Sequence, residues 1–233
     1  MAAFVWLSGK EIVISNSQPQ KMQLPGVQHV IAVASGKGGV GKSTVSANLA
    51  LALAAEGHRT GLLDADIYGP SQGVMMGAAD ARPDVENELL VPIMAHDVQC
   101  MSMSFVMTDR TPAIWRGPMA SGALQQLLGQ TRWDDVEFLV VDMPPGTGDI
   151  QLTLAQQVPL SGAVIVTTPQ DIALLDARKG VEMFRKVEVP VIGIVENMST
   201  HICSNCGHEE AIFGTGGGEK IAAEYETEFL AQL

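Results

Sequence analysis

Five continuous runs of apolar residues, rich in β-branched side chains, recur along the chain, and each is followed by a stretch with helical periodicity. Continuous runs, unlike alternating ones, are typical of parallel strands that are buried on both faces. The pattern therefore predicts an α/β fold with a doubly wound, mainly parallel sheet, and ligands at the carboxyl ends of its strands. The runs are HVIAVAS (29–35), TGLLDAD (60–66), FLVVDMP (138–144), GAVIVTT (162–168) and VIGIVEN (191–197).

The stretches that separate these runs predict crossover helices. Pro118 suits a first helical turn, and Gly57 suits a stop just after a helix. The glycine-rich GTGGG (214–218) is interpreted as a loop before a helix from Glu219 rather than as a phosphate site. The expected helices cover residues 43–56, 118–128, 150–157 and 171–185.

The two ends of the chain differ from this regular pattern. Residues 1–27 include SNSQPQKMQLPG and predict an N-terminal tail or linker, which leaves one domain over residues 28–233. The last residues, EFLAQL, predict the beginning of a further strand. We expect from this ending that the chain is shortened at its C-terminus.

Composition narrows the choice of partners and compartment. A formal net charge of -12 argues against a broad nucleic-acid footprint and against binding to an anionic membrane. The longest apolar run, Leu49–Ala55, is much shorter than a membrane span. Only three cysteines occur, and Cys203 and Cys206 are spaced for a metal or redox role rather than for a disulfide framework. These observations favour a cytoplasmic protein without nucleic-acid or membrane partners.

The strongest chemical motif is SGKGGVGKST (35–44), which matches G-x-x-x-x-G-K-[ST] between a predicted strand and a predicted helix. In such a loop, backbone N–H groups and the helix N-terminus bind phosphate oxygens. Lys42 would neutralise the β- and γ-phosphates, and the Ser43 hydroxyl would bind Mg²⁺. The expected nucleotide-binding residues of this loop are Gly36, Lys37, Gly38, Gly39, Val40, Gly41, Lys42, Ser43 and Thr44.

Polar residues at the ends of other strands extend the predicted site. Asp142 is placed as the Walker-B carboxylate of the magnesium shell. Asp64 and Asp66 are two residues apart, so an extended backbone would aim both carboxylates to one side, one toward magnesium and one toward the attacking water. Gly146 could donate its N–H to the γ-phosphate, and Asn197 could contact an adenine edge. A solvated turn at DAD and a plain strand end at Asn197 are the alternatives.

The chain contains, in this order, the motifs SGKGGVGKST, LLDADIYGPS, DMPPGTGD, TTPQDIALLDARKG, ENMS and CSNCG. Together they closely resemble the Mrp/ApbC family of iron-sulfur cluster carriers, which belongs to the MinD/ParA-like P-loop ATPases. The resemblance covers about residues 28–233 and implies a deviant Walker A motif, in which Lys37 reaches the nucleotide of a second subunit. It further implies slow ATP hydrolysis with Asp66 activating water, and adenine contact by Asn197. Family members continue past Leu233 with a strand and a helix. WRGPM (115–119) also recurs in the family, but suggests no mechanism for Arg116.

Cys203 and Cys206 provide two thiolates, whereas a four-iron cluster requires four. A two-fold dimer would supply all four, and the resemblance implies the same bridging [4Fe-4S] cluster. The alternative from the residues alone is zinc held by both cysteines with His201 and His208. A redox role is weaker, haem attachment is excluded by Gly207, and Cys100 is expected in the core.

The leading hypothesis is a homodimeric ATPase that uses ATP and Mg²⁺, receives its cluster from assembly scaffold proteins and transfers it to apo iron-sulfur proteins. The first alternative is a non-enzymatic scaffold with structural nucleotide and zinc. The second is a positioning ATPase of the ParA or MinD kind, although GEKIAAEYETEF has more Glu than Lys and lacks a basic membrane-binding face.

Overall fold

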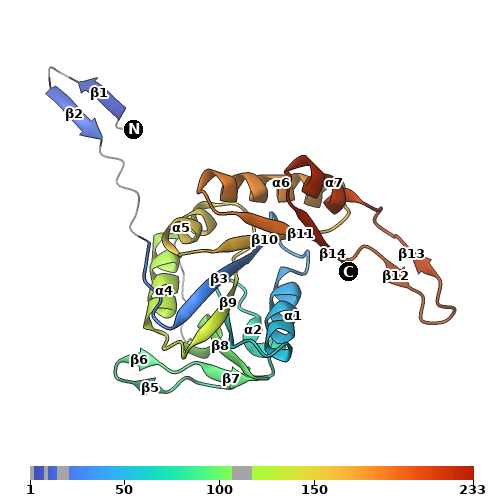
Figure 1. The fold of residues 1–233 in the computed structure, drawn as a ribbon, viewed down its shortest axis with the longest axis horizontal. Helices are drawn as coiled ribbons and strands as arrows, with labels where there is room; N and C mark the ends of the chain where they lie inside the picture. Colours follow the sequence, from blue (N-terminus) through green and yellow to red (C-terminus); the bar gives the residue numbers. More distant parts are fainter. Residues whose placement is uncertain (1–2, 8–9, 15–20, 107–116) are drawn as a thin grey trace.

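The computed structural model describes residues 3–7, 10–14, 21–106 and 117–233, and its centre is an eight-stranded sheet (Figure 1). The strand order is β14-β11-β10-β3-β9-β4-β8-β7, and every neighbouring pair is parallel except β7 with β8. The parallel strands are β3 (Val27–Ala34), β4 (Thr60–Asp64), β8 (Val98–Ser102), β9 (Val136–Asp142), β10 (Gly162–Thr167), β11 (Val191–Glu196) and β14 (Glu228–Gln232). The antiparallel edge strand is β7 (Ile93–Ala95).

Helices cover both faces of this sheet, as the doubly wound pattern requires. Figure 1 shows α1 and α2 on one side of the central strands β3 and β9, with α4 and α5 on the other. Helices α6 and α7 pack over β10 and β11. The helices are α1 (Lys42–Ala55), α2 (Gln72–Met75), α3 (Met103–Val106), α4 (Gly117–Gln130), α5 (Asp149–Gln157), α6 (Asp171–Lys186) and α7 (Gly217–Glu224).

Helix α6 shows why the sequence folds in this way. Its buried residues Ala173, Ala177, Val181 and Phe184 recur at helical spacing and form one apolar face toward the sheet. Asp171 lies in its first turn and basic residues lie in its last turn, which complements the helix dipole. In the centre of the sheet, every residue of β4 and β10 is buried, as expected of parallel strands covered on both faces.

The register brings the carboxyl ends of three strands together. Asp142 at the end of β9 pairs with Val33 of β3 on one side and with Asp64 of β4 on the other. The predicted acids and the phosphate loop therefore share one edge of the sheet, where ligands of doubly wound folds bind.

Several elements were not predicted. The parallel strand β8 and its antiparallel neighbour β7 extend the sheet beyond β4. Outside the sheet, the described residues form three short antiparallel pairs: β1 (Ala3–Leu7) with β2 (Lys10–Ile14), β5 (Val85–Glu86) with β6 (Leu89–Leu90), and β12 (His201–Ile202) with β13 (Glu209–Glu210).

The predicted N-terminal tail also differs from the structure. Residues 3–14 contain two paired strands, and β3 begins at Val27. The Met22 N–H donates to the Gln157 carbonyl at 2.9 Å, and Leu24 packs against the core. The packed domain therefore begins several residues before the expected boundary.

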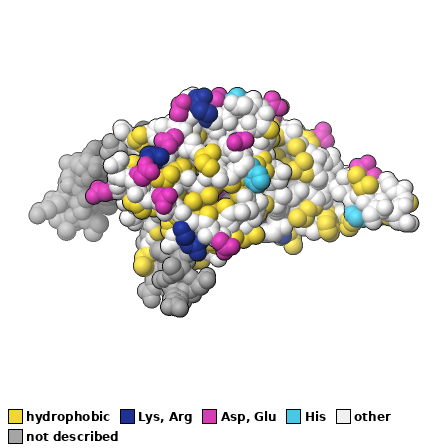
Figure 2. Space-filling model, turned by 90° about the horizontal axis from the view of Figure 1, so that it is seen from below, with side chains coloured by type: hydrophobic (Ala, Val, Ile, Leu, Met, Phe, Trp, Pro, Cys, Tyr) yellow, Lys and Arg dark blue, Asp and Glu magenta, His cyan; other side chains and the backbone are white. Residues whose placement is uncertain are grey.

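The surface fits the acidic composition. On the face drawn in Figure 2, Lys and Arg side chains stand apart among acidic ones instead of forming a patch. No helix within the described ranges is both long and apolar enough to span a membrane.

Candidate functional site

The phosphate loop, residues 35–44, joins β3 to α1 as predicted. Gly41 caps α1 with a left-handed φ of 84°. A Cβ at this position would lie 2.1 Å from Nδ2 of Asn197, so both backbone conformation and space require glycine here. The first N–H groups of α1 have no partner within the helix, which leaves this end available to an anion.

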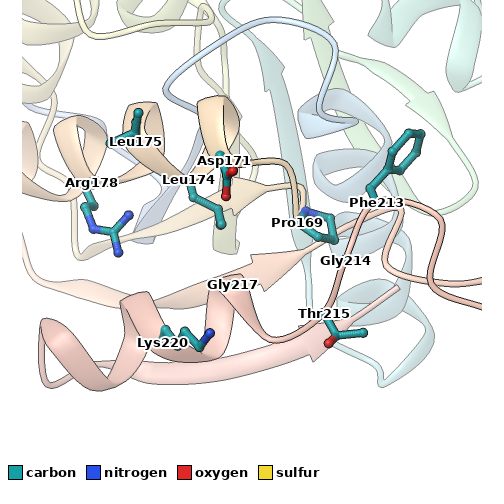
Figure 3. A pocket seen from close by; sticks show the side chains of 10 residues that line it. All are labelled: Pro169, Asp171, Leu174, Leu175, Arg178, Phe213, Gly214, Thr215, Gly217 and Lys220. Carbon is teal, nitrogen blue, oxygen red and sulfur yellow. The ribbon is translucent and has the colours of Figure 1, made fainter.

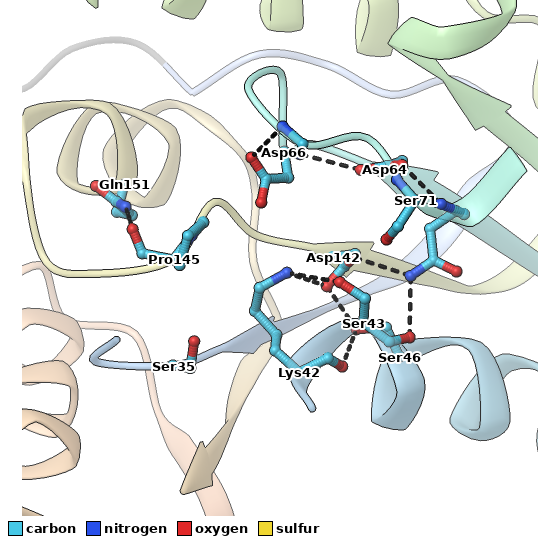
Figure 4. Close-up of polar contacts among 12 residues, drawn as sticks. Ser35, Lys42, Ser43, Ser46, Asp64, Asp66, Ser71, Asp142, Pro145 and Gln151 are labelled. Atoms are coloured by element: carbon cyan, nitrogen blue, oxygen red, sulfur yellow. Dashed lines mark hydrogen bonds and ion pairs between the residues drawn. The ribbon is translucent and has the colours of Figure 1, made fainter. Parts of the chain in front are cut away.

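A buried ion pair links the loop to the Walker-B position. Lys42 Nζ lies 2.5 Å from Asp142 Oδ1, and the two side chains are 6% and 0% exposed (Figure 4). Asp142 Oδ1 also accepts a hydrogen bond from the Ser46 hydroxyl at 2.9 Å, and Lys42 Nζ donates to Ser43 Oγ at 3.3 Å. The predicted phosphate-binding lysine and the predicted magnesium-shell acid thus form an ion pair with each other.

Gln72 completes this network and was missed by the sequence analysis. Its Nε2 donates to Asp142 Oδ2 at 2.8 Å and to the Ser43 carbonyl at 3.0 Å. The side chain is 1% exposed, and its Oε1 is buried without a hydrogen-bond partner among the described residues. Gln72 follows the GPS turn after the DAD motif, so only the path of that turn brings it to the phosphate loop.

Asp64 is fully buried beside Asp142, and four donors surround its carboxylate. Oδ1 accepts from the Asp66 N–H at 3.1 Å, while Oδ2 accepts from the N–H groups of Ser71 and Gln72 at 2.9 Å each and from the Ser102 hydroxyl at 3.1 Å. Burial raises the pKa of Asp64 to about 6, and the nearby charge of Asp142 adds to the rise, whereas the hydrogen bonds oppose it. Asp64 thus holds the loop over residues 65–72 in place, and its contact with magnesium stays a prediction.

Asp66 has a different environment from Asp64. The expectation that both carboxylates point to one side assumed an extended backbone through Asp66, but β4 ends at Asp64. Asp66 is half-buried, and its Oδ1 accepts the Gly69 N–H at 3.2 Å. Asp66 is therefore the more accessible acid of the pair.

The donor chemistry of this edge fits a magnesium ion, which prefers oxygen ligands. Ser43 offers a hydroxyl, Asp142 offers a carboxylate at the end of β9, and Asp66 offers one from the loop that follows β4. The unpaired Oε1 of Gln72 adds a buried acceptor beside them. These residues suit the hydrated magnesium ion that accompanies nucleoside triphosphates.

Three further predicted residues surround the phosphate loop. The Gly146 N–H donates to the Ser35 carbonyl at 2.9 Å, so in this arrangement it points back to the loop and is not free for a γ-phosphate. The Asn197 side chain donates to the Val40 carbonyl at 2.9 Å, which places it against the loop but leaves adenine contact a prediction. Lys37 is half-buried, and its ammonium makes no ion pair with any residue that the structure describes.

Cys203 and Cys206 lie in the turn between β12 and β13, which Figure 1 shows projecting from the body of the domain. The Gly207 N–H donates to the Cys203 carbonyl at 2.8 Å, and Gly207 has a φ of 72°, which closes a tight knuckle. Hydrogen bonds from the N–H groups of Cys206 and Asn205 hold the pKa of the Cys203 thiol below its usual value. A lowered pKa favours the thiolate, which is the form of cysteine that binds metals.

The described residues do not complete a metal site at Cys203 and Cys206. Within the described ranges, no three His, Cys, Asp or Glu side chains come together closely enough to hold a metal ion. His201 and His208, the expected partners of an intrachain zinc site, therefore do not converge with the cysteines. Cys100 is buried in β8, where burial raises the pKa of its thiol to about 12, so its expected core position is confirmed.

Two other features fall outside the predicted site. A cavity of about 480 Å³ lies between α6 and the loop before α7, lined by residues that include Asp171, Arg178, Phe213 and Lys220 (Figure 3). It contains none of the predicted site residues. Arg116 of the WRGPM stretch lies outside the described residues.

Known proteins with similar sequences include P-loop NTPases and iron-sulfur cluster carriers. The family model of the NUBPL iron-transfer P-loop NTPases (ParA) matches residues 26–233. An iron-sulfur cluster carrier protein of Pseudomonas fragi is 68% identical over 91% of this chain and 75% of its own length. One of Escherichia coli K12 is 58% identical over 99% of this chain and 63% of its own length. The mouse iron-sulfur cluster transfer protein NUBPL is 50% identical over 95% of this chain and 70% of its own length.

Solved structures place the fold in the same class. A nucleotide-binding protein from Archaeoglobus fulgidus, solved in complex with ADP, is 37% identical and matches with a TM-score of 0.80 over 90% of this chain and 83% of that chain. The cell-division ATPase MinD of Pyrococcus furiosus is 22% identical and matches with a TM-score of 0.55 over 88% of this chain and 82% of that chain. The MinD likeness supports the α/β fold alone.

Proposed function

The chain belongs to the NUBPL-type family of iron-transfer P-loop NTPases, and we propose that it is an ATP-binding homodimer that carries a bridging [4Fe-4S] cluster to apo-proteins. The cluster is the cargo in this proposal, and slow ATP hydrolysis changes how tightly the dimer holds it. Cluster-assembly scaffold proteins would supply it, and apo iron-sulfur proteins would receive it. Because thiolates must stay reduced to bind iron, the proposal includes a reducing compartment such as the cytoplasm.

The observation that carries this proposal is the incomplete metal site at Cys203 and Cys206. A four-iron cluster takes four thiolates, whereas this knuckle offers two and the described residues add no third ligand. A two-fold axis through the knuckle would place two identical pairs together. Ile202 and Ile212 next to the knuckle are 65% and 57% exposed, which suits a surface that a second chain covers.

The phosphate loop supports the ATPase part. Lys42, Ser43 and the first turn of α1 would bind the phosphates and magnesium, while Asp66 is accessible enough to orient water. Lys37 would act across the dimer on the partner's nucleotide, because a cation beside the γ-phosphate stabilises the charge that develops during transfer. Its lack of an ion-pair partner among described residues is consistent with that role.

The two alternatives have less support. A scaffold stabilised by intrachain zinc needs His201 and His208 beside the cysteines, and these four side chains form no metal-binding group in the described structure. A positioning ATPase of the MinD kind rests on fold likeness at 22% identity or below in the MinD matches, which does not carry function.

The test is anaerobic reconstitution with iron and sulfide, followed by measurement of iron, sulfide, zinc and molecular mass. We expect about four irons and four sulfides per dimer, lost in Cys203→Ala and retained in the buried-cysteine control Cys100→Ala. A colourless monomer with one zinc would refute the bridging cluster. ATP binding that survives Lys42→Ala unchanged would refute the nucleotide part.

A further inference from the structure

The segment that carries the two cysteines, residues 199–218, is anchored to the domain mainly at its two ends. Ser199 is fully buried at its start, and Gly217 and Gly218 are buried in the first turn of α7 at its finish. Between these ends, most side chains of residues 200–215 are exposed. The position of the knuckle therefore depends on what fixes the two ends of this cysteine segment.

One buried carboxylate contacts both ends. Glu196, the last residue of β11, is 0% exposed, and the Ser199 hydroxyl, 3.0 Å from both its Oε1 and its backbone carbonyl, donates to this acceptor pair. Its Oε2 accepts the Gly218 N–H at 2.6 Å. A Cβ on Gly218 would lie 3.0 Å from the Glu196 Cβ, so a side chain there would press on the carboxylate. A buried carboxylate is costly without such donors, so these contacts resist separation of the two ends.

The next residue contacts the phosphate loop. Asn197 donates to the Val40 carbonyl at 2.9 Å, and its Nδ2 occupies the space beside Gly41. Its own N–H donates to the Thr167 carbonyl at 2.8 Å, which continues the β10–β11 ladder. Side chains of consecutive residues at the end of a strand point to opposite sides. Glu196 and Asn197 therefore connect the cysteine segment and the phosphate loop through one peptide unit.

We propose that Glu196 is a positioning residue that couples nucleotide binding at the phosphate loop to the placement of Cys203 and Cys206. A nucleotide that moves the Val40–Gly41 backbone also moves Asn197, and Glu196 must follow because the two are adjacent. Both ends of the cysteine segment then shift together, since one carboxylate holds them. This coupling rests on the proposed function for its biological meaning, because the cysteines matter there as cluster ligands.

The experiment is amide hydrogen exchange on metal-free protein with and without ADP, comparing wild type with Glu196→Gln. The matched control is Glu210→Gln, which makes the same change at an exposed glutamate of β13 in the same segment. We expect ADP to change exchange over residues 199–218 in wild type and control, and to change it less than half as much in Glu196→Gln. The peptide that contains Gly218 should exchange roughly tenfold faster in that variant, the factor for losing one hydrogen bond to a charged acceptor. ADP should still bind this variant, because Glu196 does not contact the phosphate loop.

The outcomes separate this coupling from the proposed function. If ADP binds wild type but exchange of the cysteine segment does not respond, or if Glu196→Gln responds as fully as wild type, the coupling is wrong and the carrier function is untouched. If ADP does not bind wild type, the nucleotide part of the function is wrong, and the coupling with it. Should Glu196→Gln fail to fold, Ser199→Ala keeps the carboxylate and removes one anchor, and an ADP response equal to wild type in that variant would overturn the proposal.

Discussion

The two lysines of the phosphate loop should differ sharply in what they contribute to stability. Lys42 is 6% exposed and pairs with the fully buried Asp142, whereas Lys37 is half-buried and has no ion-pair partner in the described part of the chain. Lys42→Met removes the positive charge and leaves the Asp142 carboxylate, among described side chains, with the Ser46 hydroxyl and the Gln72 amide as donors. Breaking a buried pair in this way costs about 3–5 kcal/mol. Lys37→Met should change the free energy of unfolding by about 0.5 kcal/mol or less.

The assay is urea unfolding followed by circular dichroism, in buffer without nucleotide and magnesium, so that lost ligand binding does not contribute. A double variant, Lys42→Met with Asp142→Asn, removes the uncompensated charge as well. Its destabilisation should fall short of the sum of the single variants by roughly 2 kcal/mol.

Equal unfolding free energies for Lys42→Met and Lys37→Met would refute this reasoning. It would mean that the Lys42–Asp142 contact is not a buried pair in the nucleotide-free protein. Additive single and double variants would lead to the same conclusion, because two groups that do not interact contribute independently. ATP hydrolysis should be lost in both single variants, so activity alone would not separate the two roles.

Three further results are expected. The pKa of Asp64 is raised to about 6, so the folded protein binds the Asp64 proton more tightly than the unfolded chain does. The stability that this group contributes is therefore present at low pH and is lost, by about 3 kcal/mol at most, as pH rises from about 4 to 6. Asp64→Asn should flatten that part of the plot of unfolding free energy against pH. Ellman's reagent should label Cys203 and Cys206 quickly in native protein and Cys100 only after unfolding, because Cys100 is 2% exposed; three equally fast thiols would contradict the structure. Gln72→Leu should lower the free energy of unfolding by about 1–3 kcal/mol, because the Asp142 carboxylate and the Ser43 carbonyl lose a shared donor, and an unchanged urea midpoint would exclude that contribution.

The sheet was predictable where the pattern was continuous. The five expected runs all correspond to strands, β3, β4, β9, β10 and β11, with ends that differ by one or two residues. Their buried faces come from local runs of Val, Ile, Leu and Ala, which a sequence displays directly. Strand β8 was not predicted because VQCMS is short and contains Gln99, even though Val98 and Cys100 are buried.

The site was predictable only for residues inside a motif. The phosphate loop and Asp142 follow from spacing and strand ends, and the structure brings them together at one edge. Gln72 and Glu196 carry no such pattern, since each acts on residues far away in sequence through the path of a loop. The magnesium contact of Asp64 stays a prediction, and the sequence did not reveal the backbone N–H groups of the following loop that donate to its oxygens.

The proposed assembly must bring an anionic partner to Lys37 and two more thiolates to the cysteine knuckle. Lys37 lacks an anionic partner among described residues, and the knuckle has two of the four thiolates that a cluster requires. If different two-fold interfaces completed them, each chain would use two interfaces, and the assembly would grow to a tetramer or a filament. One shared interface closes at a dimer. The reconstituted protein with ATP should therefore have twice the chain mass of 24.7 kDa, measured by light scattering under anaerobic conditions. A larger species that separates into dimers when either the cluster or the nucleotide is removed would show that the two sites use separate interfaces.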